Sequence, residues 1–152
     1  MQAPVQTAGH RIIRVAAQLG VCFVLSHLIT VVVTCIADGF HWGINAWVLD
    51  TLGFGAGLFF TVQCWKASNC VSGTANKRNV WICVWACVTL CSRSIDTLML
   101  FGVIKWDDVY ATPTGPTLWA NVVSEVTFGN AFALAALLGS CMLLFKSQPA
   151  AG

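Results

Sequence analysis

Four long apolar runs dominate the pattern of hydrophobic and polar positions, and short polar segments separate them. The runs cover residues 12–37, 46–64, 80–104 and 117–145. Each is near or above the roughly 20 residues that a helix needs to cross the hydrocarbon core of a bilayer. They are too long for strands, and their apolar residues do not alternate. The pattern therefore predicts an all-α protein, an integral membrane four-helix bundle with four transmembrane helices.

The connections and the composition indicate a single domain, residues 1–152, that crosses the membrane four times. Gly, Pro, Asn and Asp, which punctuate helices, occur in the connections "DGFHWGIN", "WKASNCVSGTANKRN" and "KWDDVYATPTGP". Only 9% of the residues are charged and 57% are hydrophobic, whereas a soluble domain usually has about 25% charged residues. The first run is long for a signal peptide and lacks a clear cleavage site, so we expect it to be a retained span.

The distribution of basic residues predicts the orientation. One side of the membrane would receive six of them: Arg11, Arg14, Lys66, Lys77, Arg78 and Lys146. The other side would receive Lys105, together with acidic residues. Because basic residues favour the cytoplasmic side, both termini are expected in the cytoplasm.

Each run carries a stripe of small and polar residues at helical spacing. Small residues let helix backbones approach closely, and polar residues bond across the interface, so the stripes should face one another. The second run contains a GxxxG pair, Gly53 and Gly57. The residues expected to pack the helices are Gly20, Gly53, Gly57, Gly129 and Ala133.

Ionisable residues also lie inside the runs, where an isolated charge costs about 2.5–3.5 kcal/mol on insertion scales. The expected cluster consists of Arg93, Asp96, Glu125, His27 and Asp50. Counting residues from the ends of the runs places the first four in one layer near the membrane midplane, with Asp50 above them. Arg93 can offset its cost by pairing with Asp96 or with Glu125, since the guanidinium fork can hold two carboxylates.

The cluster has two interpretations. It contains three carboxylic acids and one arginine, so at least one acid is expected to be protonated or paired with a group from outside the chain. The cluster is either a structural ion pair that fixes the register of the helices or part of an ion or proton path.

The eight cysteines indicate no disulfide framework, because no outer connection contains a pair. Cys83, Cys87 and Cys91 repeat every four residues without a zinc spacing, and His27 has no second histidine at its depth for haem. We therefore expect no metal and no cofactor. Cys64 and Cys70, beside Lys66, are candidates for S-acylation.

The layout of four spans with internal termini and short loops resembles that of MARVEL-type and related tetraspan membrane proteins. The likeness is one of layout and includes no sequence motif. The short "DGFHWGIN" departs from claudin-type proteins, which have a long first outer loop.

The expected function is that of a structural subunit and not of an enzyme, because phosphate-binding, zinc-protease and serine-hydrolase motifs are missing. A net charge of +2 without a basic tract argues against nucleic acid as a partner. The expected partners are membrane lipids and other membrane-protein subunits, or further copies of the chain. The alternative is a small ion channel or proton-coupled transporter that uses the five ionisable residues of the expected cluster. A third reading, a pigment- or lipid-binding accessory subunit, rests only on the Trp, His and Asn residues in the runs.

Overall fold

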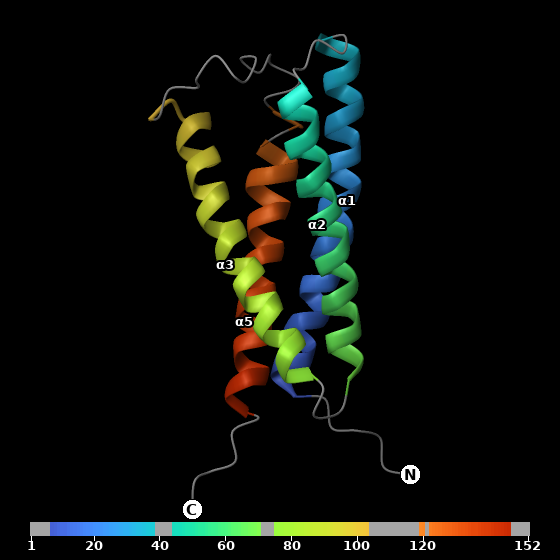
Figure 1. The fold of residues 1–152 in the computed structure, drawn as a ribbon, viewed down its shortest axis with the longest axis vertical. Helices are drawn as coiled ribbons and strands as arrows, with labels where there is room; N and C mark the ends of the chain where they lie inside the picture. Colours follow the sequence, from blue (N-terminus) through green and yellow to red (C-terminus); the bar gives the residue numbers. More distant parts are fainter. Residues whose placement is uncertain (1–6, 39–43, 71–74, 104–118, 121, 147–152) are drawn as a thin grey trace, which may run out of the picture.

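Helices make up nearly all of the chain that the computed structural model describes, which comprises residues 7–38, 44–70, 75–103, 119–120 and 122–146 (Figure 1). The side chains of residues 37–38, 44–50, 75–76, 96, 99–100 and 146 are outside the described part. The elements are α1 (Ala8–Asp38), α2 (Ile44–Asn69), α3 (Ala75–Leu100), the π-helix η1 (Val122–Gly129) and α5 (Asn130–Lys146). Since η1 runs directly into α5, the described residues form four helices and no strand. The predicted all-α class is confirmed.

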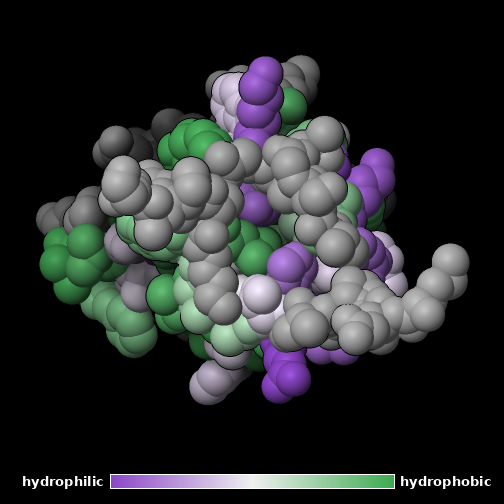
Figure 2. All heavy atoms as spheres, turned by 90° about the horizontal axis from the view of Figure 1, so that it is seen from below, coloured by the Kyte–Doolittle hydropathy of each residue, from purple (hydrophilic) through white to green (hydrophobic). Residues whose placement is uncertain are grey.

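The four helices run alternately up and down along one axis (Figure 1). α1 packs against both α2 and α5, and α3 packs against α5, whereas α2 and α3 contact each other much less. The start of α1, the end of α2, the start of α3 and the end of α5 lie at the same end of the bundle (Figure 1). We call this end the basic end, because it carries Arg11, Arg14, Lys66, Lys77 and Arg78. Figure 2 looks onto it and shows hydrophilic side chains gathered there.

Small residues let α1 and α5, the two central helices, approach each other near the basic end. Ala16, Ala17, Ala133 and Ala136 are completely buried between α1 and its neighbours. A Cβ atom on Gly139 would lie 2.8 Å from the backbone nitrogen of Ile13. This contact therefore depends on the absence of a side chain, as in tightly packed membrane helices.

Aromatic rings fill the space farther along the bundle. Trp85 of α3 stacks on Phe60 of α2 at 4.5 Å between ring centroids. On its other side Trp85 contacts Phe132 of α5 at 4.9 Å, and Phe132 contacts Phe23 of α1 at 6.3 Å. Rings from all four helices thus meet in one continuous contact.

The end of α3 is set by local backbone chemistry. Gly102 has a positive φ of 71°, and the N–H of Val103 donates to the carbonyl of Leu98 at 2.9 Å. This is a Schellman cap, in which glycine adopts the left-handed conformation without strain. The apolar run extends to residue 104, but the helix ends at Leu100 because the chain turns at Gly102.

The outside of the bundle is strongly apolar. Two helical segments, Ala8–Ile36 and Val122–Phe145, are long and apolar enough to cross a membrane. Large apolar side chains are exposed on every helix, among them Leu25, Ile29, Leu52, Leu58, Val84, Val88, Leu134 and Leu138.

Candidate functional site

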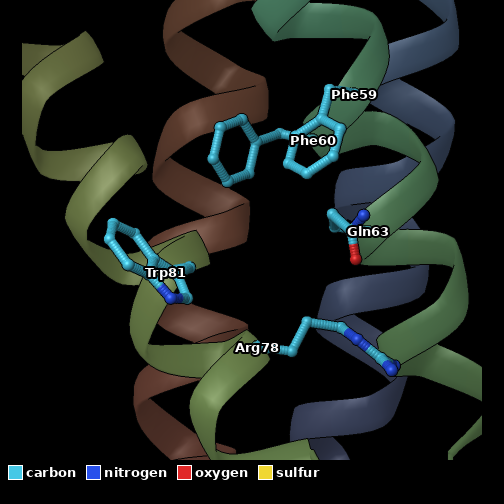
Figure 3. Close-up of a pocket in the computed structure, with 5 residues that line it drawn as sticks. All are labelled: Phe59, Phe60, Gln63, Arg78 and Trp81. Carbon is cyan, nitrogen blue, oxygen red and sulfur yellow. The ribbon is translucent and has the colours of Figure 1, made fainter.

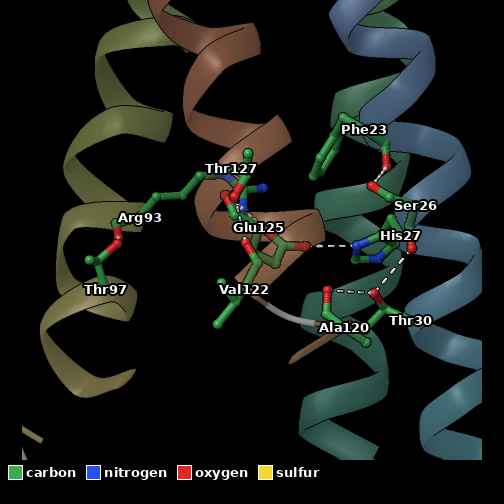
Figure 4. Close-up of polar contacts among 10 residues, drawn as sticks. All are labelled: Phe23, Ser26, His27, Thr30, Arg93, Thr97, Ala120, Val122, Glu125 and Thr127. Carbon is green, nitrogen blue, oxygen red and sulfur yellow. Dashed lines mark hydrogen bonds and ion pairs between the residues drawn. The ribbon is translucent and has the colours of Figure 1, made fainter. Parts of the chain in front are cut away.

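Three ionisable side chains from three helices meet inside the bundle (Figure 4). Glu125 of η1 forms an ion pair through Oε2 with Nη1 of Arg93 from α3. Its other oxygen, Oε1, lies 2.7 Å from Nδ1 of His27 on α1. The side chains of His27, Arg93 and Glu125 are 5%, 12% and 24% exposed. One carboxylate therefore links α1, α3 and the fourth helix, and we call these three residues the charge cluster.

Arg93 has further contacts that fix its guanidinium group. Nη1 also donates to the backbone carbonyl of Glu125 at 3.2 Å. Cζ lies 4.9 Å from the centroid of the Phe23 ring, within cation–π range. A Cβ atom on Gly129 would approach Cζ and Nη1 to 2.8 Å. Gly129 therefore leaves the space that the guanidinium occupies.

Two aromatic rings contact the imidazole of His27. Phe23 is tilted against it with ring centroids 5.7 Å apart, and Phe54 of α2 stacks on it at 5.8 Å and 24°. When Glu125 is ionised it only accepts hydrogen bonds, and Nδ1 of His27 is then the donor in this contact. Through Phe54, the second helix also contributes to the surroundings of the charge cluster.

Glu125 lies on an unusual backbone. The segment Val122–Gly129 is a π-helix, and the hydroxyl of Thr127 donates to the carbonyl of Val122, five residues earlier, at 3.1 Å. π-helical turns are rare and occur often at functional sites. The apolar run predicts a regular helix for this segment, and no feature of its amino acids indicates the wider turn.

Thr30, one turn from His27, connects α1 to the chain just before the π-helix. Its hydroxyl lies 3.1 Å from the carbonyl of Ser26 and 3.2 Å from the carbonyl of Ala120, and both oxygens accept from it. Thr30 is 4% exposed. This link between α1 and the segment before η1 lies beside the charge cluster (Figure 4).

For two members of the predicted cluster the structure gives the helix but not the side chain. Asp50 belongs to α2 and Asp96 to α3, but their side chains lie outside the described residues. The layer predicted for His27, Arg93 and Glu125 corresponds to a direct contact among these three. Of the two carboxylates considered for Arg93, Glu125 forms an ion pair with it, and the pairing with Asp96 stays a prediction.

The predicted packing residues divide into two groups. A Cβ atom on Gly20 would meet Thr61 and Phe132, and one on Gly57 would meet the Phe23 ring, so both glycines lie at close helix contacts. Ala133 is fully buried. Gly53 instead has open space around its Cβ position and makes no such contact with the described residues. Gly139 was not singled out from the sequence, although it is a small residue three positions after the fully buried Ala136.

The cysteines have different surroundings. Cys64 is completely buried in the core, so its placement argues against acylation by an enzyme that needs access to the thiol. Cys70 is half-buried near the basic end and accepts a hydrogen bond from Arg78 at 3.2 Å. Its acylation stays a prediction. Among the described residues, no group of three His, Cys, Asp or Glu side chains has the arrangement of a metal site.

Comparisons of the chain with protein families, with curated proteins and with solved structures found no match.

Proposed function

We propose that this chain is a multi-pass membrane protein without enzymatic activity that serves as a structural or assembly subunit. Its four helices would each cross the bilayer, with both termini on the cytoplasmic side. The observation that carries the proposal is the charge cluster, in which every charge has a partner inside the bundle and three helices are joined at one carboxylate.

The lengths and surfaces of the helices support a position in the membrane. α2 and α3 each have 26 residues, which at about 1.5 Å per residue is roughly 39 Å and exceeds a hydrocarbon core of about 30 Å. Both carry large exposed apolar side chains in their middle parts, such as Leu58 and Val88. A soluble protein rarely exposes so much continuous apolar surface, whereas lipid tails accommodate it at no cost.

The packing around the charge cluster supports a structural role. Phe23 lies against Arg93, Phe54 stacks on His27, and the guanidinium of Arg93 occupies the space beside Gly129, so the described side chains pack closely around the charge cluster. A buried ion pair contributes little net stability, but it penalises arrangements that separate the partners. The charge cluster would therefore specify how α1, α3 and the fourth helix are aligned.

The outer faces of the helices supply the surfaces for assembly. Gly53 and Gly55 of α2 are exposed, with open space at their Cβ positions. Small residues on an outer face allow another membrane helix to approach closely. The proposed partners are a second copy of this chain or other membrane-protein subunits, together with the surrounding lipids.

A second candidate function, proton-coupled transport, is supported by a specific observation. Glu125 is a titratable carboxylate that contacts a histidine and lies on a π-helix. A proton could pass between Glu125 and His27 if water reached them from both sides of the membrane.

Flux measurements distinguish the two functions. The purified protein is reconstituted in liposomes that contain a pH-sensitive dye, and proton uptake is followed under a potassium diffusion potential. We expect wild-type liposomes to behave like protein-free liposomes. Proton flux that is present in the wild type and lost in a folded Glu125→Gln variant would overturn the structural proposal in favour of transport.

A further inference from the structure

A groove lies between α2 and α3 on the half of the bundle near the basic end (Figure 3). It has a volume of about 380 Å³, and its lining residues are Phe59, Phe60, Gln63, Arg78 and Trp81. The groove exists because α2 and α3 contact each other little: α2 packs on α1, whereas α3 packs on α5. Its volume lies at the lower end of the roughly 300–1,000 Å³ typical of small-molecule pockets.

The walls of the groove are aromatic. Phe60 stacks on Trp85 at an interplanar angle of 13° and closes the side toward the core. Phe59 meets Phe60 edge-on at 5.1 Å. Phe59 and Trp81 are 55% and 67% exposed, so the groove opens onto the apolar outer surface. Such walls suit a hydrocarbon chain that enters from the side.

The polar end of the groove carries a positive charge that has no carboxylate partner among the described residues. Arg78 reaches from α3 toward α2 at the end of the groove near the basic end, with Gln63 facing it from α2 (Figure 3). Its guanidinium donates to the sulfur of Cys70 at 3.2 Å, and a thiol is a weak acceptor. No described carboxylate pairs with Arg78, and the sequence contains no Asp or Glu between residues 51 and 95. The groove thus combines an apolar channel with unused hydrogen-bond donors at one end.

We propose that this groove binds an anionic glycerophospholipid of the cytoplasmic leaflet. Arg78 and the amide N–H of Gln63 would donate hydrogen bonds to the phosphate oxygens, which are charge-assisted because the phosphate is ionised. One acyl chain would lie along Phe59, Phe60 and Trp81. The inference rests on the membrane position proposed above, in which the basic end is at the cytoplasmic surface. Basic pockets between membrane helices on this side are suited to anionic headgroups. Lys66, Lys77 and Arg14, at the same end, add to the attraction.

The test uses a phosphatidylglycerol with a photoreactive diazirine in its acyl chain, mixed at low level into phosphatidylcholine liposomes that contain the protein. Cross-linked peptides are located by mass spectrometry. We expect labelling to concentrate on the segments around residues 59–63 and 78–81. Excess unlabelled phosphatidylglycerol should compete, and phosphatidylcholine should not.

Two single-charge variants separate a specific site from general attraction. Arg78→Gln should lower the labelling of these segments about tenfold, because charge-assisted hydrogen bonds to the phosphate are lost. Lys77→Gln removes the same charge at the neighbouring position, which does not line the groove, and should change labelling less than twofold. Equal losses in the two variants, or labelling spread evenly over the helices, would overturn the proposal.

A third variant and two controls complete the test. Gln63→Trp keeps Arg78 and fills the groove, so it should abolish the local labelling even if Arg78→Gln proves unstable. Labelling that persists in Gln63→Trp would contradict the site, and competition by soluble glycerol phosphate would assign it to a soluble anion instead. Resistance of the protein to alkaline extraction from the liposomes is measured separately. A protein that is inserted but not labelled in the groove would overturn the lipid site alone, whereas an extractable protein would contradict the membrane position.

Discussion

Glu125 is the residue on which the charge cluster depends, because both of its carboxylate oxygens are engaged. Oε2 pairs with Arg93, and Oε1 lies 2.7 Å from His27. The surrounding Phe23 and Gly129 fix the position of the guanidinium on its other sides. Substitutions that change only a few atoms of the charge cluster should therefore lower the free energy of unfolding substantially.

Arg93→Met should lower the free energy of unfolding, since it leaves the carboxylate of Glu125 without its arginine. Breaking a buried pair in this way commonly costs about 3–5 kcal/mol. The loss should be smaller here, because Glu125 can take up a proton and its side chain is 24% exposed. Thermal unfolding of the detergent-purified protein provides the measurement.

The double variant Arg93→Met with Glu125→Gln is the control, because it removes both charges. It should recover much of the stability that Arg93→Met loses. If the single and double variants are equally unstable, the ion pair does not account for the effect, and the packing of the Arg93 side chain does.

Gly129→Ala should destabilise the protein by about 1–3 kcal/mol, the usual range for inserting atoms into a filled space. The new methyl group would lie 2.8 Å from Cζ of Arg93, so the guanidinium would have to leave its position beside Glu125. Gly55→Ala is the matched control, because its Cβ position is open and alanine favours a helix over glycine by up to about 1 kcal/mol. A Gly129→Ala protein as stable as the Gly55→Ala protein would contradict the close approach.

At the scale of the elements, the contact between α1 and α2 depends on small residues that face aromatic rings. Gly57 lies under Phe23, and Gly20 lies under Thr61 and Phe132. Phe23 also contacts Arg93 and His27, so this helix contact and the charge cluster share one side chain. A shift of α2 would be transmitted to the cluster through the Phe23 ring.

Gly57→Leu should therefore disrupt the packing of α2 and lower the unfolding temperature by several degrees, since the leucine side chain would displace Phe23. Gly53→Leu, one turn earlier on the same helix, should leave the unfolding temperature of the monomer nearly unchanged, because its Cβ position is open. Both variants are compared by thermal unfolding and by the mass of the assembly in mild detergent. Equal destabilisation by the two substitutions would refute the assignment of faces on α2.

On the outer face, Gly53→Leu tests the proposed assembly surface. If a partner helix packs on this face, the variant should reduce the mass of the assembly while each chain stays folded. An unchanged assembly would show that Gly53 faces lipid.

At the scale of the whole molecule, charge is distributed unequally between the two ends of the bundle. Arg11, Arg14, Lys66, Lys77 and Arg78 lie at the basic end, and no acidic residue occurs between residues 51 and 95. A membrane with an anionic cytoplasmic surface would favour this end by about 1 kcal/mol for each basic residue near the surface. The same asymmetry underlies both the proposed orientation and the lipid groove.

Cysteine labelling tests the orientation. A variant that keeps only Cys70 should react with a membrane-impermeant maleimide only after the cells are permeabilised, because Cys70 lies near the basic end, which is expected on the cytoplasmic side. A variant that keeps only Cys35, in the last turns of α1 at the opposite end, should not react from the cytoplasmic side. Labelling of Cys70 in intact cells would reverse the orientation.

The sequence by itself determined the helices and the residues that needed partners. Long apolar runs separated by Gly, Pro, Asn and Asp are sufficient to indicate four helices, because length and hydropathy are local properties of the chain. The high cost of an unpaired charge among apolar residues likewise pointed to His27, Arg93 and Glu125. Helical rise gave their common depth before any packing was known.

Only the tertiary structure decided which partners these residues take and which faces meet. Gly53 and Gly57 have the same spacing signal, but Gly57 packs on Phe23 and Gly53 faces outward, because the direction of a face depends on where the neighbouring helix lies. The ion pair between Arg93 and Glu125 joins two helices and depends on the space that Gly129 leaves for the guanidinium, which spacing along the chain does not reveal. The groove at Arg78 is also a tertiary property, because it arises from the gap left where α2 and α3 lean on different helices.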